Sequence, residues 1–117
     1  LCQMPGQFSP CSYLMKNFNT TLATFANVSH IKKIKLFNSY GHESGCILNK
    51  PGTQGSIKLY NHLFLVFGEL NTNAAIEGLD LYCEHVEDAK HNPGKHPNID
   101  RLLGIIKTKE TLKIIIT

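Results

Sequence analysis

Histidine, lysine and carboxylate side chains gather between residues 85 and 98, and these residue types suit acid–base chemistry. Asp88 follows His85 by three positions, so on a helix the two side chains lie on neighbouring parts of one face. A carboxylate placed there can orient an imidazole as a general base. We therefore predict His85 and Asp88 as a catalytic pair. The alternative interpretation is a solvated polar face on which His85 only covers the edge of the core.

Two loops each carry a lysine close to a predicted helix start, which favours anion binding. The free main-chain N–H groups and the positive end of the helix dipole attract an anion at such a position. The predicted ligand-binding residues are Lys50, Gly52, Gly55, Ser56, Lys95, His96 and Asn98. Neither loop has the GxxxxGK[ST] pattern of a P-loop, so the expected ligand is a small anionic, phosphorylated molecule rather than a nucleotide held by that motif. Each loop alone is also consistent with an ordinary connection.

The same residues allow a metal site as a competing interpretation. Asp88, His91 and His96 offer a mixed oxygen and nitrogen ligand set. The HExxH pattern is absent, and the three helical positions 85, 88 and 91 spread too widely around a helix to converge easily. We predict no metal site, and the sequence leaves the question of a cofactor open.

A non-catalytic interaction module is the alternative function. Residues 77–91 hold five carboxylates against one lysine, and a single helix would present most of them as an acidic ridge for a basic partner. The arrangement in space separates the two functions. A ligand site needs His85, Lys95 and His96 around one concavity, whereas a docking surface leaves the ridge convex and the histidines scattered.

Hydrophobic periodicity predicts the elements that position these residues. Apolar residues at helical spacing indicate four helices, one opening at Ser9-Pro10 and ending near Asn27, one capped by Ser56 and running to Gly68, one long helix over 72–91, and a short one capped by Asn98. For 63–67 a buried strand is the alternative. Alternating residues at 33–36 and an apolar segment at 46–48 predict a hairpin, and 112–117 a terminal strand. The predicted fold is α+β, a three-stranded sheet covered by about four helices, with residues 1–10 as an N-terminal tail and 11–117 as one domain.

Composition limits the class of protein. The chain has 117 residues, 42% hydrophobic and 18% charged, which suits one globular domain and excludes a disordered or collagen-like chain. No apolar run is long enough to span a bilayer, so we expect no membrane association. The four cysteines form no CxxC pair, which favours free thiols and a cytoplasmic location. The net charge of +3 includes no large basic cluster, so we expect no nucleic-acid binding. Nothing in the sequence indicates the oligomeric state.

Three stretches carry a resemblance to a known family. They are Asn49-Lys50-Pro51-Gly52-Thr53-Gln54-Gly55-Ser56, Glu84-His85-Val86-Glu87-Asp88-Ala89 and Pro93-Gly94-Lys95-His96-Pro97-Asn98-Ile99-Asp100-Arg101-Leu102-Leu103. The chain resembles a family of small, single-domain bacterial proteins of unknown function, from about Leu14 to Ile115, and the third stretch is the most specific. The resemblance implies a cytoplasmic bacterial protein of about this length and implies no particular activity.

Overall fold

The computed structural model describes residues 17–117, in which three strands and five helices form. The strands are β2 (Lys33–Phe37), β3 (Glu43–Leu48) and β4 (Lys113–Ile116). The helices are α2 (Phe18–Leu22), α3 (Gln54–Phe67), α4 (Thr72–Tyr82), α5 (His85–His91) and α6 (Pro97–Thr108). The predicted α+β class is confirmed.

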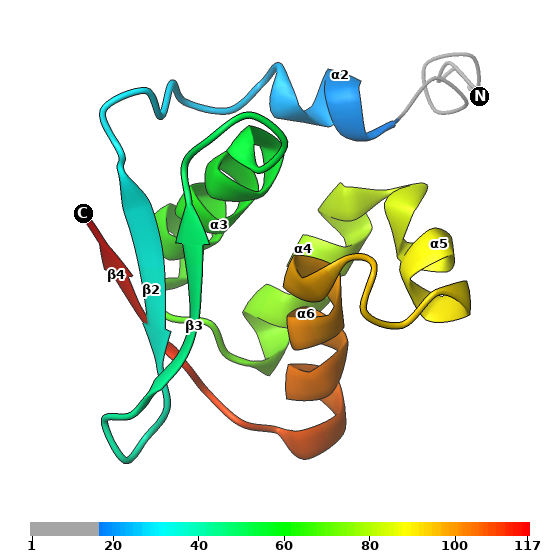
Figure 1. Ribbon diagram of the computed structural model, residues 1–117. Helices are drawn as coiled ribbons and strands as arrows, with labels where there is room; N and C mark the ends of the chain where they lie inside the picture. Colours follow the sequence, from blue (N-terminus) through cyan, green and yellow to red (C-terminus); the bar gives the residue numbers. More distant parts are fainter. Residues whose placement is uncertain (1–16) are drawn as a thin grey trace, which may run out of the picture.

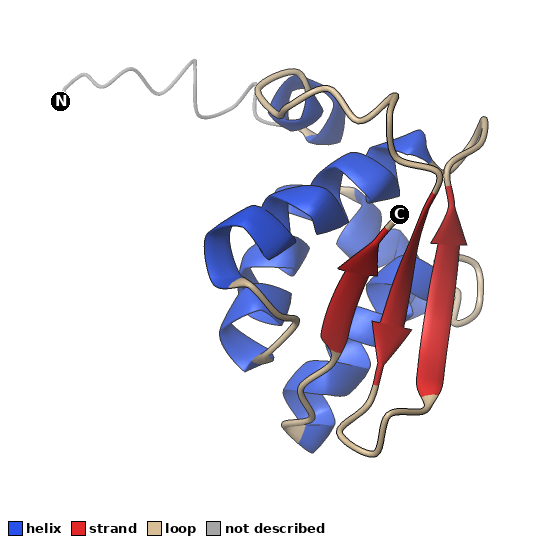
Figure 2. Ribbon diagram, turned by 90° about the vertical axis from the view of Figure 1, so that its left-hand side faces the viewer, coloured by secondary structure: helices blue, strands red, loops and turns tan. Residues whose placement is uncertain are grey.

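The sheet is antiparallel with β2 at its centre, since the strand order is β3-β2-β4. Ile34 of β2 lies opposite Ile47 of β3 on one side and opposite Ile116 of β4 on the other. Figure 2 shows β2 running opposite to both neighbours. The prediction that the hairpin and the segment 112–117 share one sheet is therefore confirmed.

Helices pack on one face of the sheet (Figure 1). Ile34 and Leu36 point toward the helices and are fully buried, whereas Lys33 and Lys35 alternate with them and are only half-buried. Side chains alternate between the two faces of a strand, so this pattern of lysine and apolar residues reports a sheet with one covered face. The core forms between that face and the helices.

Close helix packing requires Gly78 in α4. A Cβ atom at this position would lie 2.8 Å from Cδ1 of Leu102 in α6 and 3.0 Å from Cδ1 of Leu63 in α3. Both leucines are fully buried, so no space is left for a side chain on α4. The three helices thus meet directly above the sheet. The predicted helix ending at Gly68 is confirmed as α3, and the alternative strand at 63–67 is wrong.

The prediction of one helix over 72–91 is wrong, because the chain breaks after Tyr82 into α4 and α5. Cys83 has φ 54° and ψ −120°, which ends the ladder of helical hydrogen bonds. The turn allows α5 to fold at an angle to α4 (Figure 1), and this buries Ala89. Tertiary packing has overridden a continuous helical pattern, and the acidic residues of 77–91 no longer form one straight ridge.

Three predicted helix ends also differ from the structure. The first predicted helix starts outside the described residues, and α2 ends at Leu22, because Thr24 turns its hydroxyl onto the carbonyl of Thr21 and competes with the helix. Thr53 and not Ser56 occupies the cap position of α3. His96 and not Asn98 precedes α6, with Pro97 as its first residue, where the missing N–H costs nothing.

Candidate functional site

A cleft of about 410 Å³ opens where the first turns of α3 and α6 face the end of α4 and the start of α5. Gly52, Gly55 and Ser56 line one side, and Lys95, His96 and Asn98 line another, together with His85. Seven of the nine residues predicted from the sequence therefore surround one concavity. The remaining two do not line the cleft. Lys50 is exposed, and Asp88 contacts Lys95 and His96, which do line it.

The loop before α3 is held by Thr53, which leaves the helix start uncapped. The Thr53 hydroxyl donates to the carbonyl of Leu48 at the end of β3 and accepts from the N–H of Lys50 at 3.2 Å. It makes no capping bond to α3. The main-chain N–H groups of residues 54, 55 and 56 therefore have no partner among the described residues, and Gly55 and Ser56 line the cleft.

The start of α6 offers fewer unpartnered main-chain N–H groups than the start of α3. Ile99 and Asp100 donate their N–H groups to the carbonyl of His96, at 3.0 and 2.9 Å, and Pro97 has no N–H to offer. Only the N–H of Asn98 is left without a partner in the described first turn. The Asp100 side chain accepts the N–H of Gly94 at 2.9 Å, so it fixes the preceding loop instead of facing the cleft.

Asp88 joins α5 to the loop before α6. Its Oδ2 lies 2.6 Å from Nε2 of His96 and 3.0 Å from Nζ of Lys95. The hydrogen bond from His96 and then that from Lys95 lower the pKa of Asp88 to about 2. Asp88 also accepts from the side-chain amide of Asn92 at 2.9 Å. Its partner in the structure is thus His96 rather than His85, since the break at Cys83 turns α5 toward the loop.

His85 lies on an aromatic wall of the cleft. Its ring meets the ring of Phe18 edge to face with centroids 5.0 Å apart, and the ring of His96 is 5.9 Å away. Phe18 also stacks on Tyr82 at 5.2 Å. The main-chain N–H of Phe18 donates to the carboxylate of Glu84 at 3.0 Å, so the α4–α5 break anchors α2 beside the site.

Buried phenols form the floor beneath the cleft. The Tyr60 hydroxyl donates to the carbonyl of Asn98 at 2.6 Å and accepts from Arg101 at 3.0 Å, while Arg101 also donates to the side-chain oxygen of Asn98. Burial raises the pKa of Tyr60 to about 12. Burial also raises the pKa of Tyr82 well above its ordinary value. Tyr82 shares a hydrogen bond of 2.7 Å with Ser56. These bonds fix the two helix starts relative to each other.

Sequence reasoning missed Phe18, Tyr82, Tyr60 and Arg101 as site residues, because it assigned the aromatic side chains to the core. Arg101 was the one with a usable signal. It follows Asn98 by three positions in a helix start, which is the spacing for a side-chain contact.

The metal interpretation can be compared with the positions of its three predicted ligands, Asp88, His91 and His96. Asp88 and His96 touch, whereas His91 is exposed at the far end of α5. Within residues 17–117, no group of three or more histidine, cysteine, aspartate or glutamate side chains is arranged to hold a metal ion.

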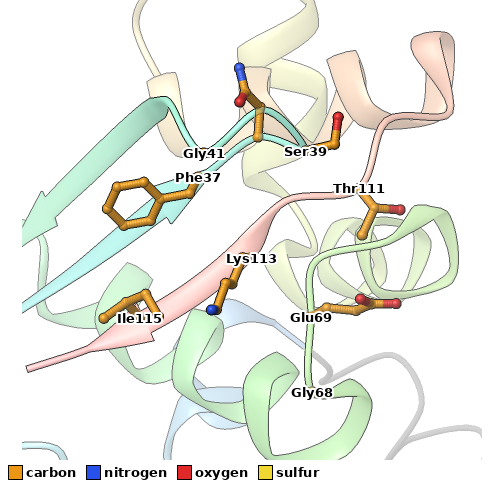
Figure 3. A pocket seen from close by; sticks show the side chains of 9 residues that line it. Phe37, Ser39, Gly41, Gly68, Glu69, Thr111, Lys113 and Ile115 are labelled. Carbon is orange, nitrogen blue, oxygen red and sulfur yellow. The ribbon is translucent and has the colours of Figure 1, made fainter.

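A larger hollow of about 820 Å³ lies elsewhere, along β4 and the β2–β3 turn (Figure 3). Among residues 17–117, its ionisable lining residues are Glu69 and Lys113, and the rest of its wall includes Phe37, Ile115 and small residues such as Gly41 and Gly68. The larger cavity is therefore not the one that is lined by the histidines and Lys95. We assign the candidate site to the smaller cleft, because His85, His96, Lys95 and the unpartnered N–H groups at the start of α3 lie there.

The fold and the cleft together define a small α+β protein with two helix starts and two histidines around one hollow. The chain belongs to a family described as uncharacterized proteins conserved in bacteria (DUF2322), whose sequence profile matches residues 18–116. The expected membership of a bacterial family of unknown function is thus confirmed. Comparison with curated proteins and with solved structures finds no match. None of the helices within residues 17–117 has the length and apolar character needed to cross a membrane.

Proposed function

We propose that this protein binds a small anionic ligand, such as a phosphorylated metabolite, in the cleft between α3 and α6, and that it does so in the cytoplasm. The observation that carries the proposal is the meeting of both predicted loops and His85 around one hollow. The free thiols of Cys46 and Cys83 are consistent with a reducing compartment.

The start of α3 supplies the main recognition of the anion. Three unpartnered N–H groups at the positive end of a 14-residue helix offer hydrogen bonds to phosphate oxygens. Charge-assisted hydrogen bonds contribute about 1.5–3 kcal/mol each before desolvation is subtracted. Gly55 lines the cleft, and the side of it where a Cβ atom would lie is covered by Phe18 and Leu22 of α2.

Lys95 supplies positive charge but shares it with Asp88. The ammonium group lies 3.0 Å from the Asp88 carboxylate, and its side chain is 60% exposed, so it can turn toward the cleft. An anion that attracts Lys95 must compete with Asp88 for it. Net affinity is therefore modest, and Asp88 sets how much of the lysine charge a ligand can use.

For a ligand with a transferable proton, His96 is the residue that acts as the general acid or base. Asp88 bonds to Nε2 of His96 and orients the ring, and His96 lines the cleft. The sequence predicts His85 as the partner of Asp88, whereas in this proposal His96 takes that role. His85 is a second imidazole on the aromatic wall, beside His96. The acidic ridge needed for the interaction-module alternative is interrupted at Cys83, so no observation favours that function.

The test is a titration of inorganic phosphate, followed by a set of phosphorylated metabolites, into ¹⁵N-labelled protein. We expect amide shifts at residues 54–56 and 95–101, and a loss of affinity of roughly tenfold or more in Lys95→Ala. Lys107→Ala is the matched control, because Lys107 is exposed at the opposite end of α6. It should bind as the unaltered protein does.

A double variant separates two reasons for weaker binding in Lys95→Ala. Removing Lys95 also frees the charge of Asp88, which repels an anion. If Lys95 contacts the ligand, Lys95→Ala combined with Asp88→Asn stays weak. If phosphate shifts no amide in these two segments, or shifts them equally in Lys95→Ala, the proposed function is wrong.

A further inference from the structure

We propose that the outer edge of β3 pairs with β3 of a second copy of this chain, antiparallel about a two-fold axis, so that two three-stranded sheets join into one of six strands. β3 is an edge strand, and among the described residues no other strand lies on its outer side (Figure 2). This inference is independent of the ligand site.

The register of the hairpin decides which main-chain groups are free. Asn49 donates its N–H to the carbonyl of Lys32, and Ile34 lies opposite Ile47 two residues further along β2. Hydrogen-bonded and non-hydrogen-bonded pairs alternate in an antiparallel ladder, so Ile47 and Gly45 face β2 with their main-chain groups. The groups of Cys46 and Leu48 face outward. Both residues are exposed, and Leu48 is 52% exposed although it is apolar.

The opposite edge of the sheet is protected over the first part of its length, whereas no bridge lies on the outer side of β3 within the described residues. Leu70 forms a bridge with Leu112 just before β4, with N–H to carbonyl distances of 2.8 and 3.0 Å in the two directions. Ile114 in β4 is only 3% exposed, so its outward main-chain groups are covered. Proteins normally protect edge strands with lysine, proline or a covering segment, and β3 itself has no lysine or proline.

The sequence around β3 is self-complementary, which identifies a second copy as the partner. With the two-fold axis at Cys46, each Cys46 exchanges both main-chain hydrogen bonds with Cys46 of the other copy. Glu43 at the start of the strand is then in register with Asn49 of the other copy, next to Lys50, so a carboxylate and an ammonium group lie at each end of the shared ladder. The exposed Leu48 comes within diagonal reach of Cys46 of the other copy and loses contact with water.

Glu43 also lies 3.5 Å from Lys35 on the neighbouring strand, and the register shifts between Leu36 and Phe37. This irregularity opposite residues 43–45 limits the flat part of the edge to about residues 45–48. The shared ladder is short, and the dimer is expected at high protein concentration rather than at every concentration.

Sedimentation equilibrium in reducing buffer over a wide concentration range tests the association. Amide hydrogen exchange on the same samples tests the surface. We expect a monomer–dimer equilibrium in which the amides of Cys46 and Leu48 become protected as concentration rises, while the amide of Ile47, bonded to β2, is protected throughout. A monomeric mass at all concentrations overturns the proposal, and so does a dimer that leaves Cys46 and Leu48 unprotected.

Two substitutions at one position supply the matched comparison. Cys46→Pro removes an outward N–H that β2 does not use, so it should weaken the dimer roughly tenfold or more through the loss of two hydrogen bonds across the axis. Cys46→Val keeps the N–H and favours a strand, so it should dimerise as the unaltered chain does. If Cys46→Pro fails to fold by circular dichroism, Leu48→Lys replaces it, since it opposes association without touching the backbone. A folded Leu48→Lys or Cys46→Pro variant that dimerises normally overturns the proposal.

Discussion

The carboxylate of Asp88 and the imidazole of His96 lie 2.6 Å apart, and this contact fastens α5 to the residue that opens α6. Residues 92–95, which connect α5 to His96, include Pro93 and Gly94 and form no helix or strand. Asp88, with Lys95 as a second partner, therefore determines where the loop places its polar side chains. The histidine that lines the cleft is held by a residue of another helix.

Acid should destabilise the protein through Asp88. The pKa of its carboxyl is lowered to about 2 from an ordinary 3.8, so the ionised form is favoured in the folded state. The stability that this provides is fully present above about pH 4 and is lost as pH falls toward 2. Thermal melts of Asp88→Asn should depend less on pH in this window than those of the unaltered protein. Equal slopes would contradict a native contact between Asp88 and His96.

Replacing Tyr60 by phenylalanine should cost stability and loosen the start of α6. The hydroxyl bonds to the carbonyl of Asn98 and to Arg101 in a fully buried place, so its removal leaves polar groups unsatisfied. We expect a loss of about 1–3 kcal/mol in the free energy of unfolding, measured by urea denaturation. Ser56→Ala, which removes only the partner of Tyr82, serves as the milder comparison.

Alkaline pH should unfold the protein in part through the same phenol. Burial raises the pKa of Tyr60 to about 12 from 10.0, so the neutral form is favoured in the folded state. This contribution is present below pH 10 and is lost as pH rises toward 12. The measurement is a pH titration in which the phenolate absorbance and unfolding are followed together. In Tyr60→Phe, one tyrosine fewer should ionise at high pH than in the unaltered protein. A titration unchanged by the substitution would refute the assignment to Tyr60.

Gly55→Ala should displace α2 from the cleft. A Cβ atom at Gly55 would lie 2.9 Å from the Phe18 ring and 3.0 Å from Cδ1 of Leu22, so α2 must move. We expect Phe18 to lose its stacking on Tyr82, which amide and ring shifts in the NMR spectrum would report. Gly104→Ala is the control, because nothing lies within 4 Å of the added methyl group. A helical glycine replaced by alanine there should gain roughly 0.5–1 kcal/mol.

Cys83→Gly should stabilise the break between α4 and α5. Cys83 adopts φ 54° with ψ −120°, a conformation that glycine reaches without the steric cost of a Cβ atom. We expect a gain of up to about 1 kcal/mol, offset in part by the loss of the Sγ contact with Thr21 at 3.8 Å. Cys83→Val, which is β-branched, should be clearly less stable than the unaltered protein. The order of the three melting temperatures checks the prediction.

The sheet could be predicted from the sequence because the alternation of polar and apolar residues in its strands is a local pattern. Alternation of lysine with Ile34 and Leu36 requires a strand with one covered face, and the apolar segment after residue 112 needs a partner that only this hairpin offers. The loops at 50–56 and 93–98 were readable for the same reason, since proline and glycine mark them. Their meeting around one cleft supports the choice of site residues.

The break at Cys83 was not readable, because helical periodicity continues through it. Leu79, Val86 and Ala89 keep the spacing of one helix, and no glycine or proline marks the turn. At the break, Asp88 of α5 contacts the loop before α6, and Glu84 accepts the N–H of Phe18. Phe18 and Glu84 are 66 residues apart, and such a contact leaves no local trace in the sequence. His96 is only eight residues from Asp88, but it lies beyond a loop, and helical spacing does not predict a contact across a loop.

The pairing of β2 with β4 has a consequence for how the chain is made on the ribosome. Ile34 can pair with Ile116 only after residues 35–116 are made, and at about 5–20 residues per second these 82 residues take about 4–16 s to synthesise. During that interval the hairpin exposes both of its edges, and the apolar face of β2 lacks part of its cover. Nascent chains are therefore expected to engage a chaperone that binds extended apolar segments until β4 emerges and docks.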